Sequence, residues 1–242
     1  MKMIQCESAQ ALGKAAAAQA AALLREAIAQ QGYARLLVST GASQFTLFEA
    51  LVKEEVDWAK VTMFHLDEYI NMPQTHPASF IGYLKERFVD IVHPGTVHYV
   101  IGMGDVKENL QALTALIREA PLDVGLIGIG ENAHIAFNDP PADFTTKEAY
   151  TIVTLDEKCR YQQFREGWFA TLEDVPKEAI SITVHEILKC KHIICAVPYT
   201  VKAQAVYDTL NAPEITPMVP ATILRSHDDV TLYVDPDSAS KL

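Results

Sequence analysis

Short apolar runs alternate with longer amphipathic stretches along most of the chain. Apolar runs bounded by turn residues are typical of buried strands, and apolar positions recurring every three or four residues are typical of covering helices. The pattern predicts strands at residues 35–39, 61–66, 97–100, 124–129, 151–155, 192–197 and 230–234. It predicts helices at residues 11–29, 44–53, 79–88, 106–119 and 200–210.

This alternation of strands and helices indicates the fold class. Strands joined through helices pair in parallel, with right-handed crossovers and helices on both faces of the sheet. We therefore expect an α/β protein with one Rossmann-like, doubly wound, mostly parallel sheet. No Pro/Gly/Ser-rich linker interrupts the 242 residues, so residues 1–242 are expected to form a single domain.

Composition narrows the classes of function. The net charge of −11 argues against a nucleic-acid partner, because phosphate backbones require a basic face. The four cysteines lack metal-ligand or redox spacing, which suits a reducing, cytoplasmic location. No apolar run approaches the ~20 residues of a membrane span, and the first residues do not resemble a signal peptide. We therefore expect no membrane partner.

Candidate chemical groups are most concentrated from Gly128 to Asp139, with the sequence GIGENAHIAFND, which we call the lead motif. It follows an apolar run and ends before two prolines, which cannot continue regular structure. Ligands of open parallel sheets bind at the carboxyl ends of strands, so His134 and Asp139 are expected beside such a site. An imidazole near a carboxylate suits acid–base chemistry at neutral pH, although a structural histidine remains an alternative.

Other predicted strand ends also carry polar residues. The turn from Thr40 to Ser43 supplies hydroxyls and backbone amides that suit a phosphate. Alternatively, Ser43 serves only as the N-cap of the following helix, which would also explain a serine at this position. Asp67 and Glu68 follow the next strand; they indicate either a solvated turn or a base that takes a proton from carbon.

A further group of candidates is basic. Arg160 and Arg165 lie close together in the sequence, and Lys202 begins a later helix. Such charges are most often solvated on helix surfaces, and spacing alone does not bring these three together.

Taken in order, several strings resemble those of glucosamine-6-phosphate deaminases. They are TGAS, FHLDEY, GIGENAHIAFND, the segment from Arg160 to Arg165, VPKEAISIT and Lys202-Ala203. The resemblance runs from about Ser39 to Asp235. The related 6-phosphogluconolactonases share the fold but have a different continuation after the histidine.

The resemblance implies catalytic roles. It makes Asp67 the base that moves a proton from C2 to C1 of the opened sugar. It makes His134 the group that opens the pyranose ring by proton transfer between O5 and O1. Asn132 would hold this imidazole and Asp139 would polarise it.

The resemblance also implies a phosphate site and a covering segment. The residues implied to bind the substrate phosphate are Thr40, Gly41, Ala42, Ser43, Arg165 and Lys202. Residues 147–175 correspond to a mobile lid that carries Arg165. No cofactor and no metal are expected, because the amine of the substrate itself provides the electron sink.

The implied activity is that of a hydrolase/isomerase converting a small-molecule hexosamine 6-phosphate, glucosamine 6-phosphate, to fructose 6-phosphate and ammonia. A galactosamine-6-phosphate enzyme, a 6-phosphogluconolactonase and a non-enzymatic sugar-phosphate sensor domain remain alternatives. The longer, hexameric members of the family bind an N-acetyl sugar phosphate allosterically through basic residues in the region that corresponds to residues 145–148. This chain reads Thr145-Thr146-Lys147-Glu148 there and ends soon after Asp235. By this resemblance we expect no such activation, and a monomer or small homo-oligomer.

The chain departs from the family pattern in three places. Ala133 replaces a common glycine before the histidine, so a positive φ there would cost about 1 kcal/mol. Asp139 is one methylene shorter than the usual glutamate. The phosphate turn reads Ala42-Ser43-Gln44 instead of the commonest glycine-containing version.

Overall fold

A parallel sheet of seven strands crosses the part of the chain that the computed structural model describes, residues 1–155, 157–165 and 167–242. All of its strand pairs are parallel. From edge to edge its strands are β1 (Lys2–Gln5), β10 (Val230–Val234), β9 (His192–Val197), β6 (Val124–Ile127), β2 (Ala34–Val38), β3 (Val61–His65) and β5 (Thr96–His98). The predicted mostly parallel α/β sheet is confirmed.

The strand order reverses between β2 and β6. From β2 the chain builds outward through β3 to β5, and it then returns to place β6 on the other side of β2, followed by β9 and β10. Connections leave these two strands in opposite directions, so a crevice opens beyond their carboxyl ends. The turn after β2 begins at Ser39 and the lead motif after β6 begins at Gly128, and both therefore lie at this crevice.

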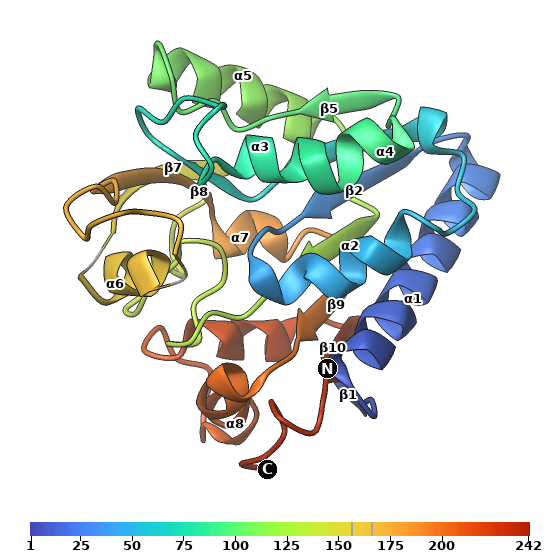
Figure 1. Ribbon diagram of the computed structural model, residues 1–242. Helices are drawn as coiled ribbons and strands as arrows, with labels where there is room; N and C mark the ends of the chain where they lie inside the picture. Colours follow the sequence, from blue (N-terminus) through green and yellow to red (C-terminus); the bar gives the residue numbers. More distant parts are fainter. Residues whose placement is uncertain (156, 166) are drawn as a thin grey trace.

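Helices cover both faces of the sheet (Figure 1). The helices are α1 (Ala9–Gln31), α2 (Phe45–Leu51), α3 (Phe80–Leu84), α4 (Asp90–Val92), α5 (Val106–Arg118), α6 (Glu157–Arg165), α7 (Val184–Ile187) and α8 (Ala203–Asn211). In β2, Leu36 and Val38 pack in one core with α1 and α2, whereas Leu37 packs in another with α5, α7 and α8. Successive strand side chains point to opposite faces, and here both faces are buried.

The long helix α1 packs closely on α2. It begins after Ser8, whose side chain accepts a hydrogen bond from the Ala11 N–H at 3.2 Å, and it ends at Gly32 in the left-handed region. Gly13 lies where a Cβ atom would come within 2.4 Å of the Thr46 carbonyl group of α2. Only glycine permits this approach, so α1 fixes the position of α2 directly behind the crevice.

A second, smaller sheet lies beside the crevice. It contains β4 (Asp67–Tyr69), β8 (Glu178–Ile182) and β7 (Tyr150–Thr154), and both of its pairs are antiparallel. The strand predicted at residues 151–155 exists as β7, but the expectation of parallel pairing is wrong for it. Burial in β7 alternates along the strand, as in an antiparallel sheet with one face turned to solvent.

Several elements differ from the sequence prediction. The expected helix at residues 79–88 consists of α3, a π-helical turn at Lys85–Val89 and α4. Strand β1, strands β4 and β8, and helices α6 and α7 were not predicted. The short 3-10 segments are Ala42–Gln44, Trp58–Lys60, Thr200–Lys202 and Pro220–Ser226. Among the described residues, no helix is both long and apolar enough to cross a membrane.

Candidate active site

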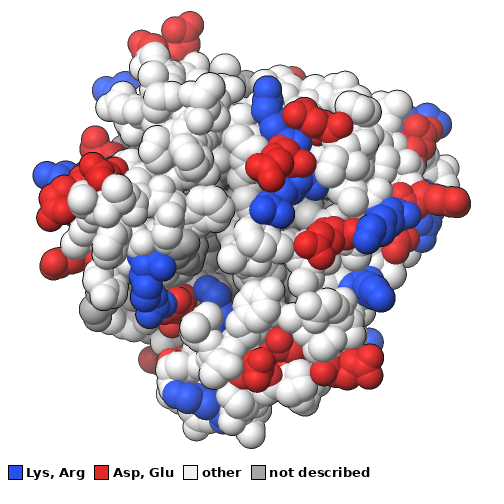
Figure 2. All heavy atoms as spheres, in the orientation of Figure 1, with Lys and Arg blue, Asp and Glu red and all other residues white. Residues whose placement is uncertain are grey.

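A cavity of about 320 Å³ opens at the crevice between β2 and β6. Figure 2 shows this face hollowed, with both basic and acidic atoms near the hollow. Most of the residues predicted from the sequence line the cavity, namely Thr40, Gly41, Ala42, Ser43, Asp67, His134, Arg165 and Lys202. The other two, Asn132 and Asp139, lie behind His134 and contact it.

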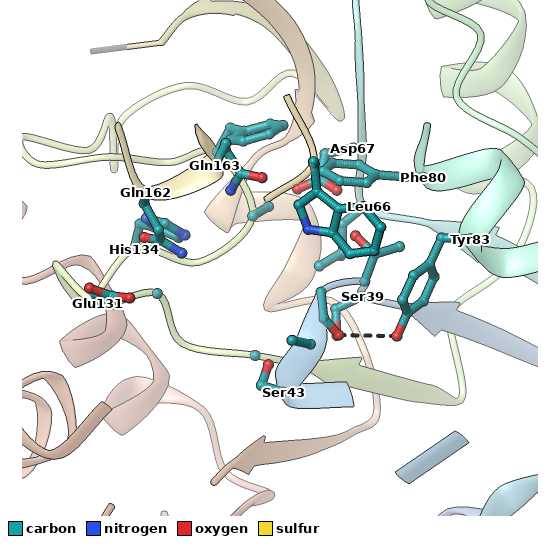
Figure 3. Close-up of a pocket in the computed structure, with 18 of the residues that line it drawn as sticks. Ser39, Ser43, Leu66, Asp67, Phe80, Tyr83, Glu131, His134, Gln162 and Gln163 are labelled. Atoms are coloured by element: carbon teal, nitrogen blue, oxygen red, sulfur yellow. Dashed lines mark hydrogen bonds between the residues drawn. The ribbon is translucent and has the colours of Figure 1, made fainter. Parts of the chain in front are cut away.

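Asp67 supplies a buried carboxyl group to the cavity (Figure 3). It is the first residue of β4, where it pairs with Ser181 of β8, and only 7% of it is exposed. Burial, together with the nearby Glu68 carboxylate, raises the pKa of Asp67 well above its ordinary value. A carboxyl group in this state is suited to accept and return a proton.

Glu68 is also buried, but it faces away from this chemistry. Its carboxylate accepts hydrogen bonds from the Tyr69 N–H at 2.9 Å, the Ser79 hydroxyl at 2.9 Å and the Ile81 N–H at 3.0 Å. It thereby anchors the start of α3, which brings aromatic side chains to the cavity. The alternative of a solvated turn at Asp67 and Glu68 is wrong, because both side chains are buried.

The lead motif folds into a tight turn that presents His134. The Gly130 N–H donates to the His134 carbonyl at 2.9 Å, and the Ala133 N–H donates to the Gly130 carbonyl at 3.0 Å. A Cβ atom on Gly130 would lie 2.2 Å from the imidazole ring, so glycine is required there. The Asn132 side chain closes the turn by accepting a hydrogen bond from the His134 N–H at 3.3 Å.

Asp139 reaches the histidine in spite of its short side chain. Its Oδ1 atom lies 3.0 Å from His134 Nδ1, a contact that becomes an ion pair when the imidazole is protonated. The same carboxylate accepts from Asn132 Nδ2 at 2.8 Å. Burial alone would raise the pKa of Asp139, but the interactions with His134, Asn132 and the Cys159 thiol lower it on balance.

Ala133 adopts the positive φ considered from the sequence, with a value of 63°. Left-handed backbone costs an alanine about 1–2 kcal/mol. Its methyl group is almost fully buried in the core beside α5 and β9, which offsets part of that cost.

The turn after β2 forms the opposite end of the cavity. Ser43 does not cap a helix, because neither the 3-10 segment at Ala42–Gln44 nor α2 has a side-chain cap, so the capping alternative is wrong. Instead its hydroxyl accepts a hydrogen bond from Gln44 Nε2 at 3.2 Å, and the same nitrogen donates to the Ala196 carbonyl at 3.1 Å. The Tyr83 hydroxyl donates to the Gly41 carbonyl at 3.0 Å (Figure 3).

Two cationic side chains line the cavity in different settings. Lys202 is only 8% exposed and lies at the start of α8. Arg165, at the end of α6, has a side chain 52% exposed and forms an ion pair with Glu131 of the lead motif. Arg160 takes no part in the cavity; its guanidinium donates to the Leu172 carbonyl at 2.7 Å and to the Val175 carbonyl at 3.2 Å.

Sequence reasoning missed much of the cavity wall. The additional lining residues include Ser39, Phe80, Tyr83, Glu131, Gln162, Gln163, Trp168 and Tyr199. Glu131 lies within the lead motif and Tyr199 lies just before Lys202, so proximity to predicted residues was an available signal for these two. Within the described ranges, no group of three or more His, Cys, Asp or Glu side chains is arranged to hold a metal ion.

Comparison with known proteins places this chain in a family. Residues 7–233 match the family described as glucosamine-6-phosphate isomerases/6-phosphogluconolactonase. The glucosamine-6-phosphate deaminase of Exiguobacterium sibiricum is 36% identical over 206 residues, covering 85% of this chain and 80% of the relative. That of Streptococcus uberis is 32% identical over 244 residues and covers 100% of both chains.

Solved structures agree with these sequence matches. A monomeric glucosamine-6-phosphate deaminase superposes with a TM-score of 0.92 at 28% identity, covering 100% of both chains. A 6-phosphogluconolactonase from Shewanella baltica superposes with a TM-score of 0.80 at 18% identity over 97% of both chains, which shows a shared fold. The family match and the full-length relatives together show that the chain belongs to the glucosamine-6-phosphate isomerase/6-phosphogluconolactonase family.

Proposed function

We propose that this protein is a glucosamine-6-phosphate deaminase that isomerises its substrate and releases ammonia. The observation that carries the proposal is that Asp67 and His134, from the ends of different strands, line one cavity that also contains Lys202. The two relatives compared above, 36% and 32% identical, are glucosamine-6-phosphate deaminases.

The phosphate group binds at the end of the cavity formed by the turn from Thr40 to Ser43. Gln44 donates to the Ser43 oxygen, which leaves the Ser43 hydroxyl proton available for a phosphate oxygen. Lys202 supplies a largely buried positive charge, whose attraction is stronger than it would be in water. Arg165 adds a second cation from α6. This binding is remote from the reacting carbons and therefore serves to position them.

His134 opens the pyranose ring. It takes the proton from the O1 hydroxyl and delivers a proton to O5 as the C1–O5 bond breaks, which leaves an open-chain aldehyde. Asp139 Oδ1 lies 3.0 Å from His134 Nδ1, so a carboxylate stands beside the imidazole that relays these two protons. Asn132 fixes the turn, and so the direction of the ring, through the His134 backbone.

Asp67 then moves a proton between carbons. It takes the proton from C2 while the substrate ammonium group gives a proton to O1, which forms an enolamine; it then returns its proton to C1, which leaves a protonated imine at C2. Water adds to C2 and ammonia leaves, so that the ketone of fructose 6-phosphate forms. Water is consumed, so the conversion is formally hydrolytic even though its central step is an isomerisation. The substrate ammonium group beside Asp67 stabilises the ionised carboxylate that burial disfavours.

Residues 147–175 act as a lid over this site. Two positions of this segment, 156 and 166, lie outside the described residues. Gln162, Gln163 and Trp168 of this segment line the cavity, and Arg165 pairs with Glu131 across it. The cavity draws its residues from segments between Ser39 and Lys202, which supports the proposal that residues 1–242 act as one domain.

The direct test is to incubate the purified protein with glucosamine 6-phosphate and to measure ammonia and fructose 6-phosphate. We expect both products in equal amounts. Galactosamine 6-phosphate assayed in parallel tests the preference at C4, and 6-phosphogluconolactone tests the lactonase alternative.

Two outcomes would overturn the proposal. One is the absence of ammonia from either amino sugar phosphate together with rapid lactone hydrolysis. The other is tight binding of sugar phosphates with no turnover of any of them, as expected of a sensor. Asp57→Asn is a suitable control for the catalytic variants, because Asp57 is half-exposed and pairs only with Lys60 at the surface.

A further inference from the structure

Tyr199 has a backbone conformation that tyrosine rarely adopts. Its φ is 81° and its ψ is 146°, in a region that is open to glycine but costs other residues free energy. It lies between β9 and the 3-10 segment Thr200–Lys202. Such strain persists only when the surroundings impose it, and it concentrates at functional sites.

A buried carboxylate holds Tyr199 in this conformation. The Tyr199 N–H donates to both oxygens of Asp235, each at 3.2 Å, and Asp235 is only 2% exposed. Asp235 is itself fixed by the Ser238 N–H, which donates to it at 2.8 Å. On the other side, the Tyr199 carbonyl accepts from the Lys202 N–H at 3.0 Å. The strained residue therefore sets the start of the segment that carries Lys202.

Tyr199 is one of the residues that line the cavity. It lies three positions before Lys202, which lines the same cavity. It is also close enough to Tyr83 that its phenol adds to the rise that burial causes in the pKa of Tyr83. Tyr83 donates to Gly41 in the phosphate turn, so the two tyrosines belong to the phosphate end.

We infer that Tyr199 is a substrate-contacting residue of the phosphate end, and that its ring closes the cavity wall beside Lys202 against a phosphate monoester. An aromatic wall removes water from between the ammonium group and the phosphate, which strengthens their attraction. This accounts for the retention of a strained tyrosine where glycine would be unstrained. The identity of the sugar in this inference rests on the proposed function. The phosphate does not, because it is argued from the cavity residues themselves.

The test compares Tyr199→Gly with wild type. Binding of inorganic phosphate and glucose 6-phosphate is measured by calorimetry, KM is measured with glucosamine 6-phosphate, and the melting temperature by thermal unfolding. Tyr199→Gly is expected to melt at a higher temperature, because glycine relieves the strain, and to bind roughly tenfold more weakly, as is typical for the loss of one good contact. Tyr199→Phe keeps the ring and is expected to bind nearly as wild type does.

His93→Gly is the matched control. His93 also has a left-handed backbone, with φ of 51°, but it is exposed and does not line the cavity. Its replacement is expected to leave binding unchanged. Tyr199→Ala carries the same kind of backbone strain as tyrosine and also removes the ring, so it replaces Tyr199→Gly if that variant fails to fold.

The inference and the proposed function fail in different ways. Ring-less variants that are folded and bind phosphate within twofold of wild type would overturn the inference, whether or not the protein is a deaminase. Absence of turnover by the wild-type protein would overturn the deaminase proposal, and the phosphate titrations would still decide the role of Tyr199. Weak binding by Tyr199→Phe would overturn the assignment to the ring, because the hydroxyl would then carry the contact.

Discussion

At the scale of single residues, Asp67 combines a proposed catalytic role with a cost to folding. In the unfolded chain its carboxyl group ionises near the ordinary pKa of 3.8, whereas burial raises the pKa of the folded state well above that value. Between these two pKa values the folded state binds more protons than the unfolded state. Stability therefore falls as pH rises through this window.

Asp67→Asn is expected to be inactive and yet more stable than wild type at about pH 8, because it removes a carboxyl group whose ionised form burial disfavours. Below about pH 3 the gain should nearly vanish, since wild-type Asp67 is then mostly protonated in both states. Thermal unfolding at the two pH values measures the difference. Asp57→Asn should show no such pH-dependent gain, and a loss of stability in Asp67→Asn at high pH would contradict the assigned burial.

Asp139 should behave in the opposite way. Its pKa is lowered in the folded state, so its contribution to stability is present above the ordinary value of 3.8 and is lost as pH falls through the folded pKa.

Asp139→Asn is expected to lower kcat by roughly 10²-fold with little change in KM, because His134 loses its charged partner. Steady-state kinetics measure this split, and a change in KM alone would exclude the polarising role.

At the scale of elements, the packing of α1 on α2 determines where the phosphate turn lies. Gly13→Ala would improve the intrinsic helix propensity of α1, but the added methyl group would overlap the Thr46 backbone. We expect a net destabilisation of about 1–3 kcal/mol, as is typical of overpacking. Denaturant unfolding measures the loss. Lys14→Ala, at the exposed neighbouring position, should change stability little, and a stabilised Gly13→Ala would contradict the close approach.

Helix α6 lies within the segment proposed as a lid, and its residues interact with both Glu131 and Asp139. Arg165 pairs with Glu131 at the cavity, and the Cys159 thiol contributes to lowering the pKa of Asp139. A bound phosphate competes with Glu131 for Arg165. We therefore expect Glu131→Gln to bind inorganic phosphate up to about threefold more tightly, in keeping with the small strength of exposed ion pairs.

Calorimetric titration with inorganic phosphate measures this effect of Glu131→Gln. Arg165→Ala should bind phosphate more weakly, and the double variant should resemble Arg165→Ala. Weaker phosphate binding by Glu131→Gln would show that Glu131 assists the phosphate site instead of competing with it.

At the scale of the whole molecule, the parallel core could be predicted because its signal is local. Strands such as β2 and β6 are short apolar runs, and the turns after them contain the glycine and polar residues that mark a site. Asp139 shows the limit of such reasoning, because only the fold of the loop determines whether a shorter carboxylate reaches His134. The structure shows that it does.

The small antiparallel sheet could not be predicted in the same way. Asp67 to Tyr69 are polar enough to indicate a turn, and they form a strand only because β8 pairs with them from far along the chain. The strain at Tyr199 is equally hidden, since it depends on Asp235, which is distant in sequence and close only in the fold. Long-range contacts of this kind override local preference.

The central claim is that one carboxylate, that of Asp67, carries the proton between C2 and C1. The most direct measurement is to run the reaction in deuterated water and to analyse C1 of the fructose 6-phosphate product by NMR. Because one base acts on one face, any deuterium should occupy only one of the two C1 positions, and Asp67→Asn should form no product. Deuterium spread equally over both positions, or near-normal turnover by Asp67→Asn, would contradict the claim.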